Sequence, residues 1–220
     1  MPELLEAGPF EAHDGEGRLL FSDAVVRLPA GRAVGLTGTS GSGKSTLLRS
    51  VVGLGRDGQE VTRRLGDDLY PRSRLPAWRS KVTLMAQDAP VVPGSLLDNI
   101  ELPYRLRVGG RRTVDGDAAR SLLHEVGLGS IPLERDVATL SGGERHRLAL
   151  VRGLLWDPPV LLADEPLSGL DERTAATCFE LLLAFAHRPG HGLLAVLHHA
   201  ELADRLDGTI HLADGRLGGP

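Results

Sequence analysis

The chain has 220 residues, of which 41% are hydrophobic and 25% are charged, as in an ordinary globular protein with one large domain. Its formal net charge of -4 and its aromatic content of 4% argue against a nucleic-acid partner, which would need a basic surface or aromatic stacking platforms. The single cysteine, Cys178, excludes a disulfide within the chain, and we expect a buried, inert thiol there.

A membrane role would need a partner protein. No apolar run approaches the roughly 20 residues that a membrane-spanning helix requires. Residues 1–11 carry acids rather than the basic and apolar regions of a signal peptide. The lone cysteine fits a reducing cytosol.

The N-terminal part predicts a β-rich region followed by a buried strand and a helix. Short strands are expected at 4–6, 19–21 and 24–28, between turns that contain Gly and Pro. The continuous apolar run over 33–37 is typical of a strand covered on both faces. The helical pattern over 45–52 stops at a glycine.

The middle of the chain predicts helices, and the last third returns to buried strands. Helical patterns lie around 96–102, 118–126 and 145–156, and the Gly/Arg segment 105–112 between the first two reads as a solvated loop. Two prolines end the third helix. Apolar runs over 160–163 and 193–197 predict further parallel strands. The alternation indicates an α/β fold with a mostly parallel sheet.

A phosphate-binding loop follows the strand over 33–37. The segment Gly38-Thr39-Ser40-Gly41-Ser42-Gly43-Lys44-Ser45 matches G-x-x-x-x-G-K-[ST], in which glycines turn backbone N–H groups toward a phosphate at a helix N-terminus. Lys44 can reach the β- and γ-phosphates, and Ser45 can bind Mg²⁺. The candidate nucleotide-binding residues here are Gly38, Thr39, Ser40, Gly41, Ser42, Gly43, Lys44, Ser45 and Thr46.

Acidic and imidazole side chains follow the two later strands. Asp164 and Glu165 end the run over 160–163, and His198 follows the run over 193–197. Ligands of open parallel sheets bind beyond the carboxyl ends of the strands, so these side chains and Lys44 should meet at one edge. An apolar strand followed by Asp is the arrangement that holds Mg²⁺ in nucleotide hydrolases. The alternative for Asp164 and Glu165 is a helix N-cap.

The segment Leu140-Ser141-Gly142-Gly143-Glu144 resembles the LSGGQ signature of ATP-binding-cassette (ABC) ATPases, with Glu in place of Gln. Other family motifs follow in order: Gln87 resembles the Q-loop glutamine, Ser168-Gly169-Leu170-Asp171 the D-loop, and His198 the switch histidine. The resemblance covers 4–217. It implies a P-loop NTPase core with an N-terminal antiparallel β subdomain (1–87 and 156–220) and an inserted helical signature subdomain (88–155).

The resemblance also implies roles for these residues. Two copies would pair head-to-tail, with each MgATP between one P-loop and the partner's signature residues Ser141, Gly142 and Gly143, and with Asp171 nearby. Glu165 would polarise the attacking water while Asp164 holds Mg²⁺. Gln87 and His198 would sense the γ-phosphate, Gln87 by reaching Mg²⁺ or the lytic water.

Two positions depart from the family pattern. The aromatic residue that usually stacks on adenine is replaced by Ala12, and Phe10 is either its substitute or part of the core. His199 stands where an aspartate usually follows the switch histidine. Adjacent strand-end residues point in opposite directions, so His198 and His199 should not share a metal.

The expected function is the ATPase subunit of a bacterial ABC transporter, held at the inner face of the cell membrane by a separate membrane subunit. The alternatives are a soluble ABC ATPase in DNA maintenance or translation, and a P-loop kinase or GTPase. The segment 87–104 resembles small cassettes proposed to export iron, with amino-acid and lipoprotein-releasing cassettes as competitors. The apolar residues Leu96, Leu97 and Tyr104 are expected either to dock the membrane subunit or to pack the helical subdomain.

Overall fold

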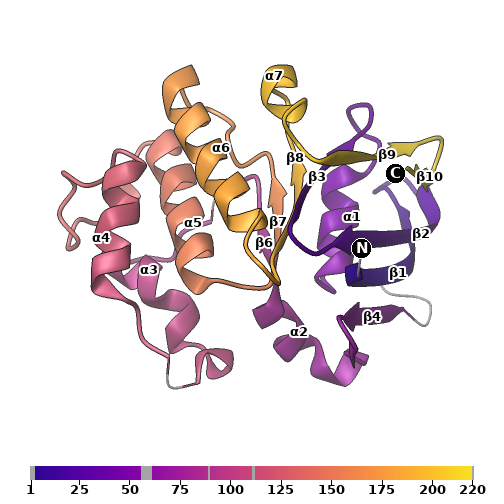
Figure 1. Cartoon of the computed structure of the whole chain (residues 1–220), viewed down its shortest axis with the longest axis horizontal. Helices are drawn as coiled ribbons and strands as arrows, with labels where there is room; N and C mark the ends of the chain where they lie inside the picture. Colours follow the sequence, from indigo (N-terminus) through magenta and orange to yellow (C-terminus); the bar gives the residue numbers. More distant parts are fainter. Residues whose placement is uncertain (1–2, 56–60, 89, 111, 220) are drawn as a thin grey trace.

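The fold consists of two β-sheets and a group of helices (Figure 1). The computed structural model describes residues 3–55, 61–88, 90–110 and 112–219. A four-stranded antiparallel sheet has the order β2-β1-β4-β5, and a six-stranded sheet has the order β10-β9-β3-β8-β7-β6. In the larger sheet the strands pair in parallel, except for the β9–β10 hairpin.

The smaller sheet is formed by β1 (Glu3–His13), β2 (Leu19–Pro29), β4 (Thr62–Leu65) and β5 (Asp68–Leu69). The larger sheet is formed by β3 (Arg32–Thr37), β6 (Val82–Met85), β7 (Val160–Asp164), β8 (Gly192–Val196), β9 (Gly208–Ala213) and β10 (Arg216–Gly218). The helices are α1 (Lys44–Val51), α2 (Leu75–Lys81), α3 (Leu96–Arg105), α4 (Gly116–Glu125), α5 (Gly142–Trp156), α6 (Glu172–Ala186) and α7 (Ala200–Ala203). Short 3₁₀ turns occupy Arg72–Arg74, Arg107–Gly109 and Val137–Thr139.

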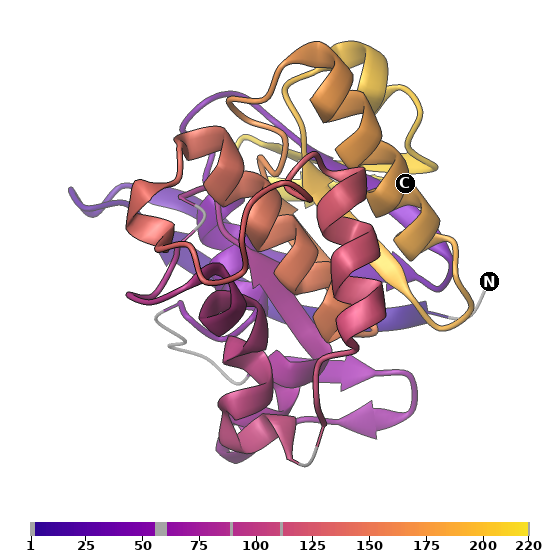
Figure 2. The ribbon, with the colours of Figure 1, turned by 90° about the vertical axis from the view of Figure 1, so that its left-hand side faces the viewer.

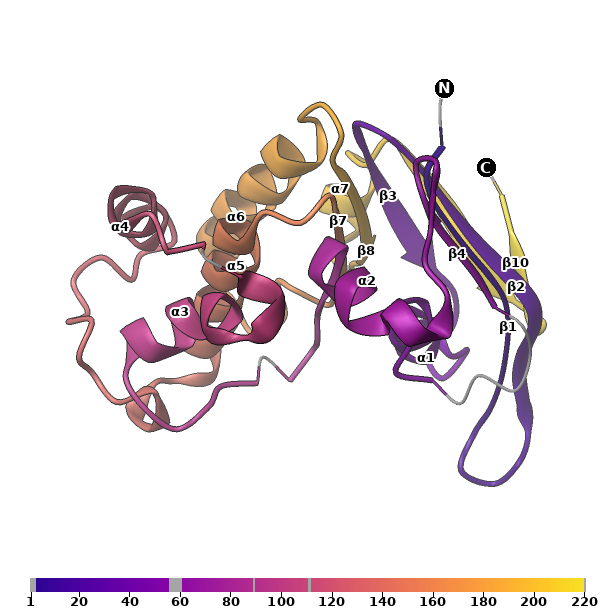
Figure 3. The same ribbon diagram turned by 90° about the horizontal axis from the view of Figure 1, so that it is seen from below.

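Alternating side chains of the larger sheet enter two different hydrophobic cores. In β7, Leu161 faces one core and Leu162 the other, as the two-residue period of a strand requires. One core contains α5 and α6. The other contains α1 and the smaller sheet, so α1 lies between the two sheets (Figure 3). Both faces of the parallel strands are therefore covered, which explains their continuous apolar runs.

The predicted α/β class and P-loop NTPase core are confirmed. The runs over 33–37, 160–163 and 193–197 are β3, β7 and β8. The strands expected at 19–21 and 24–28 form one strand, β2, which pairs with β1 through register shifts. The buried thiol of Cys178 is also confirmed, and burial raises its pKa to about 11. In the described parts of the chain, no helix combines the length and apolar character needed to cross a bilayer.

The helices α3, α4 and α5 lie side by side at the far side of the larger sheet from β1 and β2 (Figures 1 and 2). Leu96 is fully buried in the core under these helices, and the Tyr104 hydroxyl donates to the Leu155 carbonyl at 2.5 Å. The expectation of an exposed docking surface at Leu96 is thus wrong, because this amphipathic face packs against α5. Helical periodicity marks an apolar face but not what covers it.

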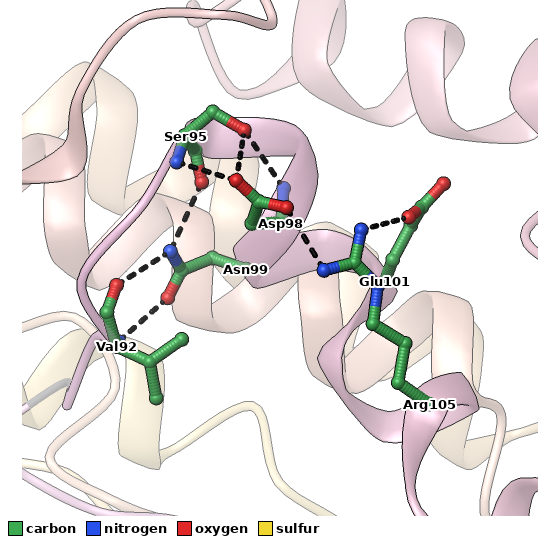
Figure 4. Close-up of polar contacts among 6 residues, drawn as sticks. All are labelled: Val92, Ser95, Asp98, Asn99, Glu101 and Arg105. Atoms are coloured by element: carbon green, nitrogen blue, oxygen red, sulfur yellow. Dashed lines mark hydrogen bonds and ion pairs between the residues drawn. The ribbon is translucent and has the colours of Figure 1, made fainter.

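A polar network fixes the start of α3 (Figure 4). Ser95 and Asp98 form a reciprocal capping box, and the hydrogen bonds from Ser95 hold the pKa of Asp98 at about 2. The fully buried Asn99 accepts from Val92 N–H at 2.9 Å and donates to the carbonyls of Val92 and Ser95, each at 3.0 Å. This one amide therefore satisfies both backbone groups of Val92 in the loop that leads from β6 into α3.

Replacing Asn99 should destabilise the chain more than breaking an exposed ion pair on the same helix. Asn99→Ala removes the side-chain partner of the part-buried Val92 N–H and carbonyl, at a cost of about 1–3 kcal/mol in the free energy of unfolding. The Ser95 carbonyl keeps the Asn99 backbone N–H as a donor. The matched control, Glu101→Ala, removes only the surface pair with Arg105 and should cost less than about 1 kcal/mol. Urea unfolding at pH 7 measures both. Equal losses would contradict the assigned role of Asn99.

Candidate nucleotide-binding and hydrolysis site

The P-loop joins the end of β3 to the start of α1. Gly38 has φ 150°, and a Cβ there would lie 2.4 Å from the Leu212 carbonyl oxygen, so only glycine fits. Gly43 is the N-cap of α1 in a left-handed conformation and provides no side-chain cap. The first N–H groups of α1 thus have no side-chain partner at the cap and can bind an anion.

Lys44 is turned inward onto its own loop. Its ammonium donates to the carbonyls of Gly38 and Thr39, each at 2.9 Å. The Ser42 hydroxyl is buried and has no hydrogen-bond partner among the described atoms. A cation, an orphaned hydroxyl and uncapped N–H groups in one loop are a donor set that matches a phosphate chain.

Asp164 ends β7 beneath the P-loop and is 2% exposed. Burial raises its pKa and the neighbouring Glu165 charge adds to the rise, while a side-chain hydrogen bond with Ser45 and the charges of Arg49 and Lys44 oppose it. Its Oδ1 atom has no hydrogen-bond partner in the described structure. A buried carboxylate with a free oxygen beside a serine hydroxyl fits a hard cation such as Mg²⁺.

This pair alone would not complete a metal shell. Among the described residues, no group of three or more His, Cys, Asp or Glu side chains is placed to hold a metal ion. Mg²⁺ usually takes one or two protein ligands and completes its shell with phosphates and waters. The residues present therefore fit a cation that arrives with a nucleotide.

Glu165 lies between two side chains delivered by the neighbouring strands. It accepts a hydrogen bond from the Gln87 amide at Oε2 (3.0 Å) and contacts His198 Nε2 at Oε1 (2.6 Å). Gln87 follows β6, Glu165 follows β7 and His198 follows β8, so the predicted catalytic trio converges on one carboxylate. Neither Asp164 nor Glu165 caps a helix, because α6 begins later, after Asp171; this excludes the N-cap alternative.

The backbone of Glu165 has φ 52°, a left-handed conformation that is unfavourable for a residue with a side chain. Its N–H donates to the Val196 carbonyl at 3.1 Å, and its carbonyl accepts from Ser168 N–H at 3.1 Å. These bonds hold the strained turn, which is typical of functional sites. The Gln87 side chain donates its amide N–H to Glu165, and in the described structure it forms no hydrogen bond with Asp164 or Ser45.

The signature motif opens α5. The helix begins at Gly142 rather than near Arg145, because Ser141 and Glu144 form a capping box. A Cβ on Gly143 would lie 3.4 Å from the Gly169 carbonyl oxygen, so the signature adjoins the D-loop of its own chain. Asp171 caps α6 by accepting from Thr174 N–H at 3.0 Å. No described hydrogen bond joins the signature residues to the P-loop.

Phe10, one candidate for stacking on adenine, is not available for that role. Phe10 is 2% exposed and belongs to the core under the smaller sheet, so of its two alternatives the core is correct. The Arg63 guanidinium lies 5.8 Å from its ring centroid and covers it further. Ala12 is half-buried.

One site-linked residue has no signal in the sequence analysis. His146, on α5, contacts the Gln87 carbonyl oxygen through Nε2 at 2.7 Å. It lies two residues beyond the signature motif, where helical periodicity predicts only a partly covered surface position. Only the spatial approach of α5 to the end of β6 reveals the contact.

Comparisons with known proteins agree with this geometry. The ABC transporter family matches residues 21–168. The chain is 38% identical over 202 residues to the aliphatic sulfonates import ATP-binding protein SsuB 1 of Paracoccus denitrificans, covering 88% of this chain and 76% of the relative. It is 35% identical over 210 residues to the lipoprotein-releasing system ATP-binding protein LolD of Syntrophotalea carbinolica, covering 91% and 89%.

Two further similarities cover more than nine tenths of the chain. The chain is 36% identical over 210 residues to the uncharacterized ABC transporter ATP-binding protein YbbA of Escherichia coli K12, covering 92% and 90%. Its fold matches a bacterial Atm1-family ABC exporter solved with ATP bound, with a TM-score of 0.83 at 23% identity. That match covers 99% of this chain but 38% of the exporter chain. The chain therefore belongs to the ABC transporter family, as an ATP-binding subunit with ATPase activity.

Proposed function

We propose that two copies of this chain pair head-to-tail, hydrolyse MgATP at the paired surfaces and drive a separate membrane subunit. The observation that carries the proposal is that the P-loop and the signature share no hydrogen bond in the described structure, while both present glycines with open space beside them. A Cβ on Gly41 in the P-loop or on Gly142 in the signature would meet nothing within 4 Å. Each site is incomplete alone, and a two-fold axis brings each P-loop against the partner's signature.

The chemistry assigned to each residue follows from its contacts. In this proposal, Lys44 leaves its two carbonyl partners for the β- and γ-phosphates, and Ser45 and Asp164 hold Mg²⁺, which neutralises phosphate charge. Glu165 accepts the proton of the attacking water. Gln87 and His198 orient the Glu165 carboxylate.

Asp164 provides a test of the cation site without nucleotide. Its pKa is raised in the folded chain, so the folded state binds this proton more tightly than the unfolded state, and ionisation at neutral pH destabilises the fold. Asp164→Asn should therefore raise the melting temperature at pH 7 without Mg²⁺ or ATP, while ATPase activity is lost. Asp171→Asn is the control: hydrogen bonds from Thr174 lower the pKa of Asp171, so this variant should not be stabilised.

A lower melting temperature for Asp164→Asn would contradict the claim that the ionised Asp164 carboxylate destabilises the folded chain. Full ATPase activity in the same variant would contradict its assignment to Mg²⁺.

Glu165 tests the hydrolytic step and the dimer together. Glu165→Gln keeps the shape of the side chain but removes the base, so turnover should fall about 10²- to 10⁴-fold while ATP still binds. ATP that cannot be hydrolysed should trap a dimer on size-exclusion chromatography. Glu172→Gln, an exposed acid at the start of α6, should hydrolyse normally. A monomeric Glu165→Gln variant with full hydrolysis would refute the proposal.

A groove between α2, α3 and α5 is the proposed docking site for an amphipathic helix of the membrane subunit. It has a volume of about 240 Å³, and the residues of its apolar lining include Leu84, Met85, Leu102, Leu106, Val108 and Trp156. Leu106 and Val108 are 53% and 38% exposed, so the exposed apolar residues lie just after the C-terminal end of α3. Arg79 and Arg152 also line the groove, which favours an acidic residue on the docked helix.

Leu106→Asp should abolish co-purification of the membrane subunit but leave basal ATPase activity intact. The change places a charge in the apolar mouth of the groove. Leu69→Asp is a matched control because Leu69 on β5 is exposed to the same extent, 53%, but lies outside the groove. Detergent pull-down with the tagged chain measures the association. Loss of association in both variants, or in neither, would place the docking surface elsewhere.

The most specific part of the proposal concerns the transported substrate. The resemblance of 87–104 to iron-exporting cassettes supports iron export. The names of the similar proteins instead refer to sulfonate import and lipoprotein release. Cargo chemistry belongs to the membrane subunit, which would also hold this chain at the inner face of the cell membrane. Transport of iron by the co-purified complex in vesicles tests this proposal, and its absence would favour the other two classes.

A further inference from the structure

The helix that begins at the signature motif, α5, contacts the end of β6 and the segment that follows it at several points. His146 Nε2 lies 2.7 Å from the Gln87 carbonyl oxygen, and Arg152 Nη2 donates to the Pro90 carbonyl at 2.9 Å. Next to Arg152, α5 also approaches the end of β6 closely at Gly153, where a Cβ would lie 3.3 Å from the Met85 sulfur. Among the described residues, the polar contact between the first turns of α5 and the main chain at Gln87 is the one made by His146.

The chemistry of this contact defines the state of the His146 ring. A backbone carbonyl can only accept a hydrogen bond, so the proton is on Nε2. The Nδ1 atom is buried and has no hydrogen-bond partner in the described structure. The ring thus has a single hydrogen-bonding contact, and that contact is with the Gln87 main chain. A side chain with no donor would leave the carbonyl unpaired.

The two functional groups that this contact connects serve different nucleotides in the proposed dimer. The Gln87 side chain donates to Glu165 at 3.0 Å, in this chain's own hydrolytic site. Ser141 lies five residues before His146 on the same helix, about 7.5 Å along the helix axis, and in the dimer it would face the partner's ATP. His146 is the contact between them.

We propose that His146 is a positioning residue that sets the main chain of Gln87 on the signature helix and thereby couples the two ATP sites of the dimer. The inference rests on the proposed head-to-tail dimer. With the contact in place, a displacement of Gln87 by the occupant of its own site shifts the N-terminus of α5. Without it, Gln87 loses its orientation toward Glu165, and the two sites act independently.

The test compares His146→Gln with His146→Met in the full-length chain. Both side chains are unbranched, similar in size and good helix formers, but only Gln has an N–H donor. His146→Met should lower kcat about 10- to 100-fold, the loss expected when an orienting contact is removed, with KM for ATP changed less than about 3-fold and a Hill coefficient near one. His146→Gln should recover most of kcat and the cooperativity.

Two controls separate positioning from folding. His124→Met replaces an exposed histidine on α4 and should leave all three quantities unchanged. Urea unfolding should give the His146→Met and His146→Gln variants similar free energies of unfolding. A purely structural role of His146 would instead lower the stability of the Met variant, without lowering kcat selectively relative to KM. Should His146→Met fail to fold, His146→Leu provides the donor-free comparison.

A double-mutant cycle with Gln87→Ala identifies the route. If His146 acts through Gln87, His146→Met should cost little more in kcat when Gln87 is already replaced. Additive losses would overturn the inference, as would equal kcat in the Gln and Met variants. Full activity of Gln87→Ala alone would instead refute the proposed role of Gln87 in hydrolysis. Impaired Gln87→Ala with normal His146→Met would overturn only the coupling role of His146.

Discussion

The parallel register of the larger sheet is the constraint on which the site depends. Leu84 pairs with Leu162, and Leu162 pairs with Leu194, so these strands are aligned row by row. Gln87 and Glu165 each lie three residues beyond their paired leucine, and His198 lies four beyond Leu194. Because parallel strands end at one edge, this register alone brings side chains far apart in sequence within hydrogen-bonding distance. A slip of one residue would send them to the opposite face.

Two residues at this edge of the sheet are energetically unfavourable for folding, one for electrostatic and one for conformational reasons. Asp164 is a buried carboxylate whose pKa is raised by burial, and Glu165 occupies a left-handed conformation that costs on the order of 1–3 kcal/mol. The burial of β7 and β8 offsets these unfavourable free energies, because both faces of the two strands are covered and every residue in them is buried. The stability of the sheet therefore permits a strained, charged edge, and a cation with phosphate would relieve part of that charge.

Sequence patterns predicted the buried strands β3, β7 and β8, the P-loop and the strand-end side chains of Asp164, Glu165 and His198, because each depends on local spacing and on the period of a single element. The assignment of Gln87 came instead from the family resemblance. Sequence patterns did not decide whether an apolar residue is exposed or buried when the answer depends on packing between separate elements. Leu96 and Phe10 are apolar residues with two readings, exposed or buried, and only the packing of α5 and of the smaller sheet decides between them. The capping role of Asp171 is a local signal, whereas the contact of His146 requires the path of α5.

The segment after β6 belongs to both the hydrolytic edge and the docking groove. Met85 and Pro90 line the groove, while Gln87, between them in sequence, reaches Glu165. A helix seated in the groove would press on the same short stretch of backbone that carries this amide. In the proposed complex, mechanical coupling between the partner and the nucleotide would pass through the main chain around Gln87, which α5 contacts through His146 and Arg152.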